Sequence, residues 1–195
     1  MRLHIYLFRH GESYYNKDKR FTGWTNSTMD KTGWKQVKKL AKKLKNKKFQ
    51  VAYHSRLIRS KHTLREVLKY HPECKEVIQD DRIIERDYGR LTRKFHKTII
   101  KKYGKKQFNL WHRNYDIPPP GGESIKAVEK RVLSFIKDMI GKMKKEKVNV
   151  AVSAHGNSMR PFRKYFEKLT DKQMMRIENP WDDYFEYVIN VDKTK

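Results

Sequence analysis

The sequence predicts an α/β fold, a three-layer sandwich in which a mostly parallel central sheet lies between two layers of helices. Short apolar segments typical of buried strands alternate along the chain with longer segments of helical periodicity. The first of these strands and a later one near residue 150 both run directly into a His-Gly pair. We expect a single domain over residues 1–195, a length that allows a sizeable core.

The first predicted strand covers residues 3–8, which are apolar except for one histidine, and it ends at Arg9 and His10. An arginine pairs with phosphate oxygens while a neutral imidazole nitrogen attacks phosphorus, so this pair suits phosphate chemistry. The alternative is a core histidine beside a surface arginine, and these residues alone do not decide between the two. We expect Gly11 to permit a turn that a residue with a β-carbon would resist.

The remaining elements follow from the spacing of apolar residues. Residues 31–47 are predicted to form a helix whose apolar face includes Trp34. We predict further strands at residues 51–54, 77–78, 148–154 and 184–191, and further helices at residues 59–69, 95–103, 107–113, 125–143 and 159–169. Residues 118–122 must form a loop, because three prolines and two glycines break any helix there. We expect the tail from Asp192 onward to be mobile.

Two histidines distant in sequence, His10 and His155, each follow a predicted core strand. If these strands are neighbours, the two imidazoles meet at the carboxyl edge of the sheet, where open α/β sheets bind ligands. With Arg9 and Arg59 they would offer several donors to one phosphoryl group. The sequence therefore predicts a phosphate site at this edge.

The charge balance has two interpretations. The chain carries 47 Lys and Arg against 22 Asp and Glu, a net charge of +25. This excess is typical of a nucleic-acid-binding surface, or of a lysine-rich catalytic domain whose field steers anionic substrates. The lysines are spread over most predicted helices, without a basic arm, a zinc-finger spacing or an RNA-recognition motif. We therefore favour the catalytic domain and expect no nucleic-acid partner.

Cysteine content and hydropathy suggest where the protein works. A single cysteine, Cys74, cannot form an intramolecular disulfide, which fits a reducing compartment. Apolar segments are shorter than a membrane span, and the first strand is too short and too polar for a signal peptide. We expect a cytoplasmic protein without a membrane partner. We also expect no metal, because the histidines lack companion ligands at metal-binding spacing.

Short motifs occur in order along most of the chain. They are Arg9–Ser13 with Asn16, Phe21–Trp24, Ser55 with Arg59, Glu85–Gly89, Trp111 with Arg113, Tyr115–Pro120 and Ala154–Arg160. Together they resemble the signature of the histidine phosphatase superfamily and, within it, of the cofactor-dependent phosphoglycerate mutases. The short connection at residues 120–124 is similar to that of the compact mutases, which lack a longer insertion of their larger relatives.

The resemblance implies a role for each matching residue. His10 would be the nucleophile that becomes phosphohistidine, and Glu85 would be the general acid and base. Arg9, Arg59 and His155 would hold the oxygens of the transferring phosphoryl group. The remaining matches imply a substrate-binding set of Ser13, Asn16, Thr22, Gly23, Arg86, Tyr88, His96, His112, Arg113, Gly156 and Asn157.

Three positions depart from the mutase pattern. His112 stands where the first of two adjacent arginines is usual, and His96 stands where a lysine is usual. Residues 178–182 replace a turn of the Asn-x-Pro-Thr-Gly type. These changes predict a thinner positive shell around the far end of a bisphosphorylated ligand.

The resemblance implies that the protein interconverts 2-phosphoglycerate and 3-phosphoglycerate in glycolysis and gluconeogenesis, as an isomerase primed by 2,3-bisphosphoglycerate. Its partners would be small anionic phosphoglycerates, and a homo-oligomer is compatible with the family. The alternative is a histidine-type phosphatase that hydrolyses small phosphomonoesters at the same site. A third hypothesis is a nucleic-acid-binding module, which would bind polyanions in a salt-dependent way that survives loss of His10.

Overall fold

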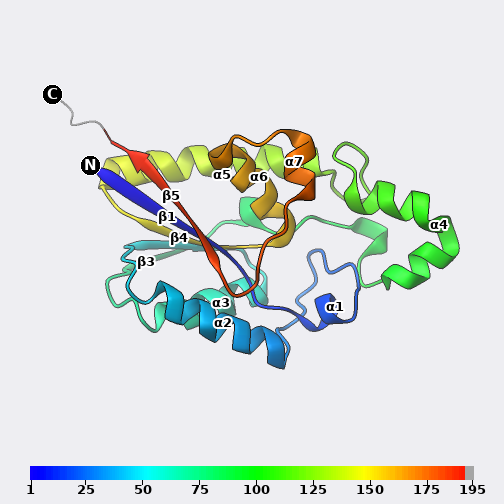
Figure 1. Cartoon of the computed structure of the whole chain (residues 1–195), viewed down its shortest axis with the longest axis horizontal. Helices are drawn as coiled ribbons and strands as arrows, with labels where there is room; N and C mark the ends of the chain where they lie inside the picture. The colour runs from blue at the N-terminus through cyan, green and yellow to red at the C-terminus, as the bar shows by residue number, and fades with distance from the viewer. Residues whose placement is uncertain (192–195) are drawn as a thin grey trace.

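The structure, a computed structural model, describes residues 1–191 and has a central sheet between two layers of helices (Figure 1). The strands are β1 (Arg2–Arg9), β2 (Val51–His54), β3 (Glu76–Gln79), β4 (Val150–Ala154) and β5 (Tyr184–Asn190). The helices are α1 (Tyr14–Lys17), α2 (Lys31–Leu44), α3 (Ile58–Leu68), α4 (His96–Arg113), α5 (Ile125–Glu146), α6 (Gly156–Glu167) and α7 (Asp171–Arg176). Two 3-10 helices are η1 (Asp81–Ile83) and η2 (Gly89–Leu91). The predicted α/β sandwich is confirmed.

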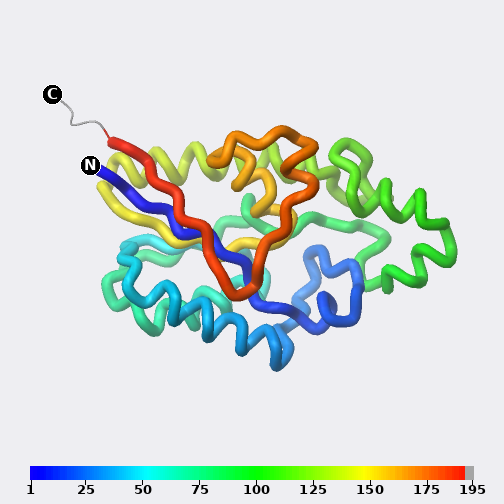
Figure 2. The backbone as a smooth tube through the Cα atoms, viewed as in Figure 1, coloured from blue at the N-terminus to red at the C-terminus, as the bar shows by residue number. Residues whose placement is uncertain are grey.

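The sheet has five strands in the order β3-β2-β4-β1-β5. β1, β2, β3 and β4 pair in parallel, and β5 runs antiparallel beside β1. Figure 2 shows β1 between β4 and β5, both from the C-terminal part of the chain. The carboxyl ends of β1, β2 and β4 therefore lie at one edge of the sheet, and the next residues in the chain are His10, Ser55 and His155.

Both faces of β1 are buried, which explains its almost continuous apolar sequence. Leu3, Ile5 and Leu7 pack into a cluster with side chains of α5 and α6. Tyr6 and Phe8 point the other way and pack with side chains of α2 and α3. Each fully buried side chain of this size contributes about 1.5–3 kcal/mol. The burial on both sides fixes the strand, and thereby the position of the residues that follow it.

Several elements differ from the sequence predictions at their ends. Helix α2 ends at Leu44, three residues before the predicted boundary, and α6 begins directly after His155. The two helices predicted between residues 95 and 113 form the single stretch α4, interrupted at Gly104 with φ of 80°. The short helices α1 and α7 were not predicted. The expectation for the tail from Asp192 concerns residues outside the described range.

One expectation about a single residue is wrong, and another holds for a different physical reason. Trp34 was expected on the buried face of its helix, but it is 36% exposed. Its ring lies at the surface, beside the ring of His62 on α3. Gly11 does not have a positive φ. A β-carbon there would lie 2.5 Å from the carbonyl oxygen of Gly33, so the glycine allows the chain after β1 to approach α2 closely.

Beyond the carboxyl edge of the sheet, α4 and the loops around it form a cap (Figure 1). A separate apolar cluster holds this cap together: Phe21, Tyr88, Leu91, Ile99 and Phe108. The cap stands over the edge at which His10 and His155 lie. Across residues 1–191, none of the helices has the length and apolar character needed to span a membrane.

Candidate active site

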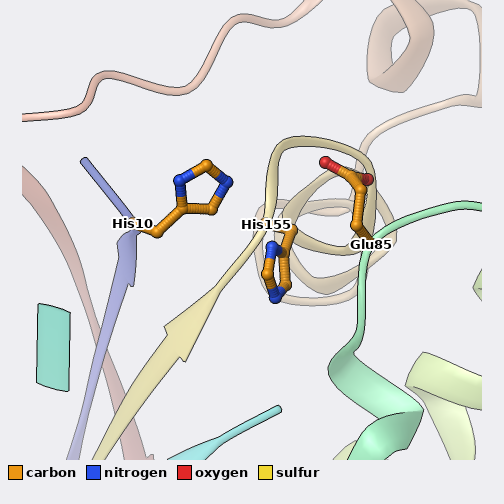
Figure 3. Close-up of side chains that lie close together, drawn as sticks. All are labelled: His10, Glu85 and His155. Carbon is orange, nitrogen blue, oxygen red and sulfur yellow. The ribbon is translucent and has the colours of Figure 1, made fainter. Parts of the chain in front are cut away.

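His10 and His155 face each other at the carboxyl edge of the sheet. Their ring centroids are 4.9 Å apart, at an interplanar angle of 54°. Figure 3 shows His10 at the end of β1, His155 at the end of β4, and Glu85 on a loop beside them. The structure therefore brings together two imidazoles that lie on separate strands and were expected to converge.

The hydrogen bonds of His10 define the chemistry of each ring nitrogen. Nδ1 lies 2.7 Å from the carbonyl oxygen of Gly11, so Nδ1 carries the proton and donates it. Nε2 then holds the lone pair, and Nε of Arg59 donates to it at 3.2 Å. Burial lowers the pKa of His10 well below its usual value, and the charges of Arg59 and Arg9 lower it further. His10 is therefore a neutral imidazole with its lone pair on Nε2.

Arg59 is held rigidly although it is charged and only 1% exposed. Its terminal nitrogens donate to the carbonyl oxygens of Thr25 and Gly23, at 2.7 and 2.9 Å. Burial lowers the pKa of Arg59 to about 10, which still leaves the guanidinium charged at neutral pH. These bonds leave Nε directed at His10, where it can contact a group bound to that ring.

His155 is positioned by Ser55, which follows β2. The Ser55 hydroxyl accepts from the Leu57 amide at 3.3 Å, so its own proton is available to Nε2 of His155, 2.7 Å away. This arrangement favours a proton on Nδ1, which is buried and has no partner among the described residues. Burial lowers the pKa of His155, and Arg59 and His10 lower it further. A neutral His155 therefore has an unused donor.

Glu85 lies on the loop after η1 and is 7% exposed. Its Oε1 accepts from the amides of Arg86 and Asn157, at 2.8 and 3.1 Å. The loop itself is anchored, because the indole of Trp24 and the guanidinium of Arg131 both donate to the Glu85 carbonyl. The carboxylate is therefore fixed beside the two imidazoles and can exchange a proton with a group bound between them.

Arg9, the last residue of β1, is held by residues of the segment before β5. Its Nη1 donates to the Asn179 carbonyl at 3.0 Å, and its guanidinium lies 4.4 Å from the centroid of the Trp181 ring. Asn179 in turn donates to the Gly156 carbonyl at the start of α6. The Nε of Arg9 is buried without a partner within the described chain. The C-terminal segment before β5 thus positions this arginine.

A cavity of about 130 Å³ opens next to these groups. It is lined by Arg9, Asn16, Arg20, Phe21, Thr22, Gly23, Glu85, Tyr88, His96, His112, Arg113, Gly156, Asn157, Arg160, Glu178 and Asn179. Buried donor atoms without a partner in residues 1–191 include Thr22 Oγ1 and Arg86 Nη2, in addition to those of Arg9 and His155. Buried donors rarely stay unpaired, so such a group of them suits an anionic ligand.

The predicted site residues occupy three kinds of position. Most of the predicted substrate-binding residues line the cavity itself. His10, Arg59 and His155 are buried next to Glu85 rather than along the cavity wall. Arg86 is fully buried and donates to the Glu123 and His112 carbonyls. Ser13 is also fully buried and caps α1 by bonding to Asn16, so its contact with the cavity is indirect.

Five lining residues were not assigned from the sequence: Arg20, Phe21, Arg160, Glu178 and Asn179. Phe21 and Arg160 lie within recognised motifs, which could have pointed to them. Arg160 comes from the second turn of α6, and its position became visible only once that helix was known to begin at Gly156. Glu178 and Asn179 lie in the segment that departs from the family pattern.

His96 and His112 stand on the cap side of the cavity, 5.0 Å apart between ring centroids. Both pack against the rings of Phe21 and Phe108. Burial and the charge of Arg113 lower the pKa of His112 to about 3, and the same causes lower the pKa of His96. Both rings are therefore neutral at pH 7. They add no positive charge to this wall of the cavity, where Arg113 is the nearby cation.

The group formed by His10, Glu85 and His155 could also be considered for a cation. One ligand atom from each lies within 4.8 Å of the others. However, Arg59 donates directly to Nε2 of His10, and the charges of Arg59 and Arg9 act on both imidazoles. Two guanidinium groups repel a metal ion and attract a phosphate. The electrostatics of the site therefore favour an anion.

Comparison with known proteins identifies the family. A protein of Parvibaculum lavamentivorans named 2,3-bisphosphoglycerate-dependent phosphoglycerate mutase is 36% identical over 177 residues, covering 89% of this chain and 84% of that protein. The phosphoglycerate mutase of Schizosaccharomyces pombe is 39% identical over 179 residues, with the same coverage of 89% and 84%. A mycobacterial glucosyl-3-phosphoglycerate phosphatase shares the fold, with a TM-score of 0.83 at 18% identity over 96% of this chain and 91% of its own. The sequence profile of the histidine phosphatase superfamily (branch 1) matches residues 5–189, and the chain belongs to this superfamily.

Proposed function

We propose that this protein is a 2,3-bisphosphoglycerate-dependent phosphoglycerate mutase that interconverts 2- and 3-phosphoglycerate through a phosphohistidine at His10. The observation that carries the proposal is the state of His10. Its Nδ1 proton is fixed on the Gly11 carbonyl, and its Nε2 lone pair lies among charged donors. The names of relatives more than 30% identical over most of the chain support the mutase reaction.

In the first step, Nε2 of His10 attacks the phosphorus atom of one phosphoryl group of a bound bisphosphoglycerate, and the bond between that phosphorus and its ester oxygen breaks. Glu85 gives its proton to the leaving oxygen, which becomes a hydroxyl group. Once Nε2 of His10 is bonded to phosphorus, it no longer accepts a hydrogen bond, and the Nε–H of Arg59 donates to a phosphoryl oxygen instead. Arg9 and His155 donate to the other phosphoryl oxygens. Positioning and charge stabilisation of this kind dominate the catalysis of phosphoryl transfer.

In the second step, the free hydroxyl group of a bound monophosphoglycerate attacks the phosphohistidine. Glu85, now a carboxylate, takes the proton of that hydroxyl, and the lone pair returns to Nε2. A mutase must keep water away from the phosphohistidine until this step is complete. The burial of His10, which is 1% exposed, supports this part of the proposal.

The enzyme must be phosphorylated before its first turnover, and 2,3-bisphosphoglycerate would supply that phosphoryl group. The residues present fit a ligand with several anionic groups. Arg9 Nε, Thr22 Oγ1 and Arg86 Nη2 are buried donors without partners among the described residues. Arg20, Arg113 and Arg160 add positive charge along the cavity.

The proposal is tested by trapping the phosphoenzyme. The protein is incubated with 2,3-bisphosphoglycerate labelled in its phosphoryl groups, and acid-labile phosphate on His10 is located by peptide mass spectrometry. The same samples are assayed for conversion of 3-phosphoglycerate and for release of inorganic phosphate. We expect labelled His10 and isomerisation that far exceeds phosphate release.

Two variants complete the experiment. His10→Ala should abolish both labelling and isomerisation. His62→Ala, on the outer side of α3 beside Trp34, should leave both unchanged. Rapid release of phosphate without isomerisation would replace the mutase with the alternative phosphatase. A fully active His10→Ala variant would rule out this site.

A further inference from the structure

A single carboxylate, that of Glu178, bridges two arginines at the open end of the cavity. Its Oε1 lies 3.5 Å from Nη1 of Arg113 and 3.5 Å from Nη2 of Arg160. All three residues line the same cavity. An acidic side chain is unexpected in a cavity whose other charged groups, apart from Glu85, are arginines.

The backbone at Glu178 is fixed while its side chain is free. The Glu178 carbonyl accepts from Arg163 at 2.9 Å. The next residue, Asn179, is 5% exposed and is held by Arg9, Arg163 and Gly156. The Glu178 side chain, by contrast, is 73% exposed, and within residues 1–191 it has only the two long ion pairs. Rotation about its own bonds would move the carboxylate into solvent without any change in the fold.

The two arginines differ in how firmly they are held. Arg160 has a side chain only 6% exposed, and its Nη1 donates to the carbonyls of Met174 and Met175 at 3.0 and 2.7 Å. Arg113 ends α4 and has a side chain 49% exposed. A buried, fixed guanidinium paired with a mobile one forms a subsite for an anionic group of a ligand.

We propose that Glu178 is an internal competitor for this anion subsite, and that a carboxylate of the substrate displaces it. This inference rests on the proposed function, because it assumes a phosphorylated carboxylic acid whose phosphoryl group is held at His10. The substrate carboxylate would then take over the ion pairs of Glu178 with Arg113 and Arg160. A phosphomonoester without a carboxylate would leave Glu178 in place.

Glu178 therefore acts as a specificity-determining residue. A ligand with a second anionic group recovers the energy of the two ion pairs that it breaks, whereas a neutral group in the same place cannot. Exposed ion pairs are weak, so the competition is modest and is screened by salt. Glu178 lowers the affinity for a ligand whose carboxylate must displace it, and it does not affect a ligand that leaves it in place.

A matched pair of ligands tests this inference. 3-Phosphoglycerate and glycerol 3-phosphate differ only in a carboxylate against a hydroxymethyl group. Their dissociation constants are measured by calorimetry at low salt for the unaltered protein and for Glu178→Gln. We expect the variant to bind 3-phosphoglycerate about fivefold more tightly, the gain that one exposed ion pair would give, with little change for glycerol 3-phosphate. The preference for the carboxylate should rise by the same factor.

Two controls separate local competition from general charge. Glu146→Gln removes the same charge at the far end of α5 and should not alter the preference. In an Arg113→Gln background, Glu178→Gln should have a much smaller effect, because the subsite has lost one of its cations. The gain in the Glu178 variant should also diminish at high salt.

The outcomes also separate this inference from the proposed function. An unchanged preference in Glu178→Gln, or an equal gain for both ligands, would overturn the role of Glu178 even if isomerisation is intact. A shifted preference without phosphorylation of His10 would support Glu178 and reject the mutase. Failure of the unaltered protein to bind either ligand would overturn both.

Discussion

The floor and the rim of the cavity differ in burial and in the contacts that hold them. We define the floor as His10, Ser55, Arg59, Glu85 and His155, none of which is more than 7% exposed. We define the rim as His96, His112, Arg113, Glu178 and Trp181. On the rim, the side chains of Arg113 and Glu178 are 49% and 73% exposed, and their ion pair is 3.5 Å long. Hydrogen bonds as short as 2.7 Å hold the floor.

The comparison suggests that the floor and the rim have different roles in the reaction. Floor residues stand at strand ends, on the first turns of α3, or on an anchored loop, so they cannot adjust to different ligands. Rim residues come from the cap and from the segment before β5, and the exposed side chains of Arg113 and Glu178 have room to move. We therefore expect changes on the floor to reduce kcat and changes on the rim to alter KM, selectivity or stability.

After the loss of His10 itself, the largest effect should come from Glu85→Gln on the floor. The amide keeps the volume of the side chain and can still accept from Arg86 and Asn157, but it cannot transfer a proton. We expect kcat for isomerisation to fall by about 10²–10⁴-fold, with KM changed much less. Steady-state kinetics with 3-phosphoglycerate measure both values.

A matched control for Glu85 exists elsewhere in the chain. Glu129, on α5, is also 7% exposed, but it bonds to Tyr115 and to Lys164 on α6 and is not among the residues that line the cavity. Glu129→Gln should retain kcat. If Glu85→Gln retained it as well, the proton carrier would be another group.

Ser55→Ala tests the floor without touching the reacting groups. The variant leaves Nε2 of His155 without its hydrogen bond and removes the contact that defines which nitrogen is protonated. We expect about a tenfold slower transfer of phosphate to His10 at unchanged KM, the loss typical of one hydrogen bond. Single-turnover labelling measures this rate.

Ser153→Ala is the control, since Ser153 is equally buried but bonds only to Ser60. Its phosphorylation rate should stay unchanged. A normal rate in Ser55→Ala would mean that packing alone orients His155. That result would weaken the distinction between a rigid floor and an adaptable rim.

The same division explains what could be predicted from the sequence. His10 and His155 follow strands buried on both faces, so apolar runs and the parallel topology were enough to place them at one edge. Local patterns do not show which distant segment folds back over that edge. Glu178 lines the cavity because the segment after α7 returns there, and α7 is too short to produce a clear periodic signal. The close approach that requires Gly11 also depends on a distant residue, Gly33.

A smaller effect is expected at Trp181, which joins the rim to the floor through Arg9. Its ring lies over the Arg9 guanidinium at 4.4 Å, an interaction worth about 0.5–2 kcal/mol. Trp181→Leu should loosen Arg9 and raise KM by about threefold to tenfold. Trp181→Phe keeps an aromatic face and should restore most of the affinity. Equal KM values for the two variants would show that only the apolar volume matters.

The smallest effect should be a pH dependence of stability at His112. The unfolded chain protonates this histidine near pH 6.5, whereas the folded chain does so only at about pH 3, because the ring is buried and lies near Arg113. Between these values the unfolded state binds the additional proton. Stability is therefore lost as the pH falls below about 6.5. Over one pH unit this amounts to about 1.4 kcal/mol at most.

His112→Gln removes this titration while keeping a polar side chain of similar reach. Urea unfolding at pH 7.5 and pH 5.5 should show a smaller loss of stability for the variant than for the unaltered protein. The buried histidines of the floor have lowered pKa values too, but they are present in both proteins and cancel in the difference. Identical losses would mean that His112 is accessible to protons in the folded state. The cap would then open to solvent at acid pH while the floor stays closed. The two regions would therefore differ in local opening as well as in burial.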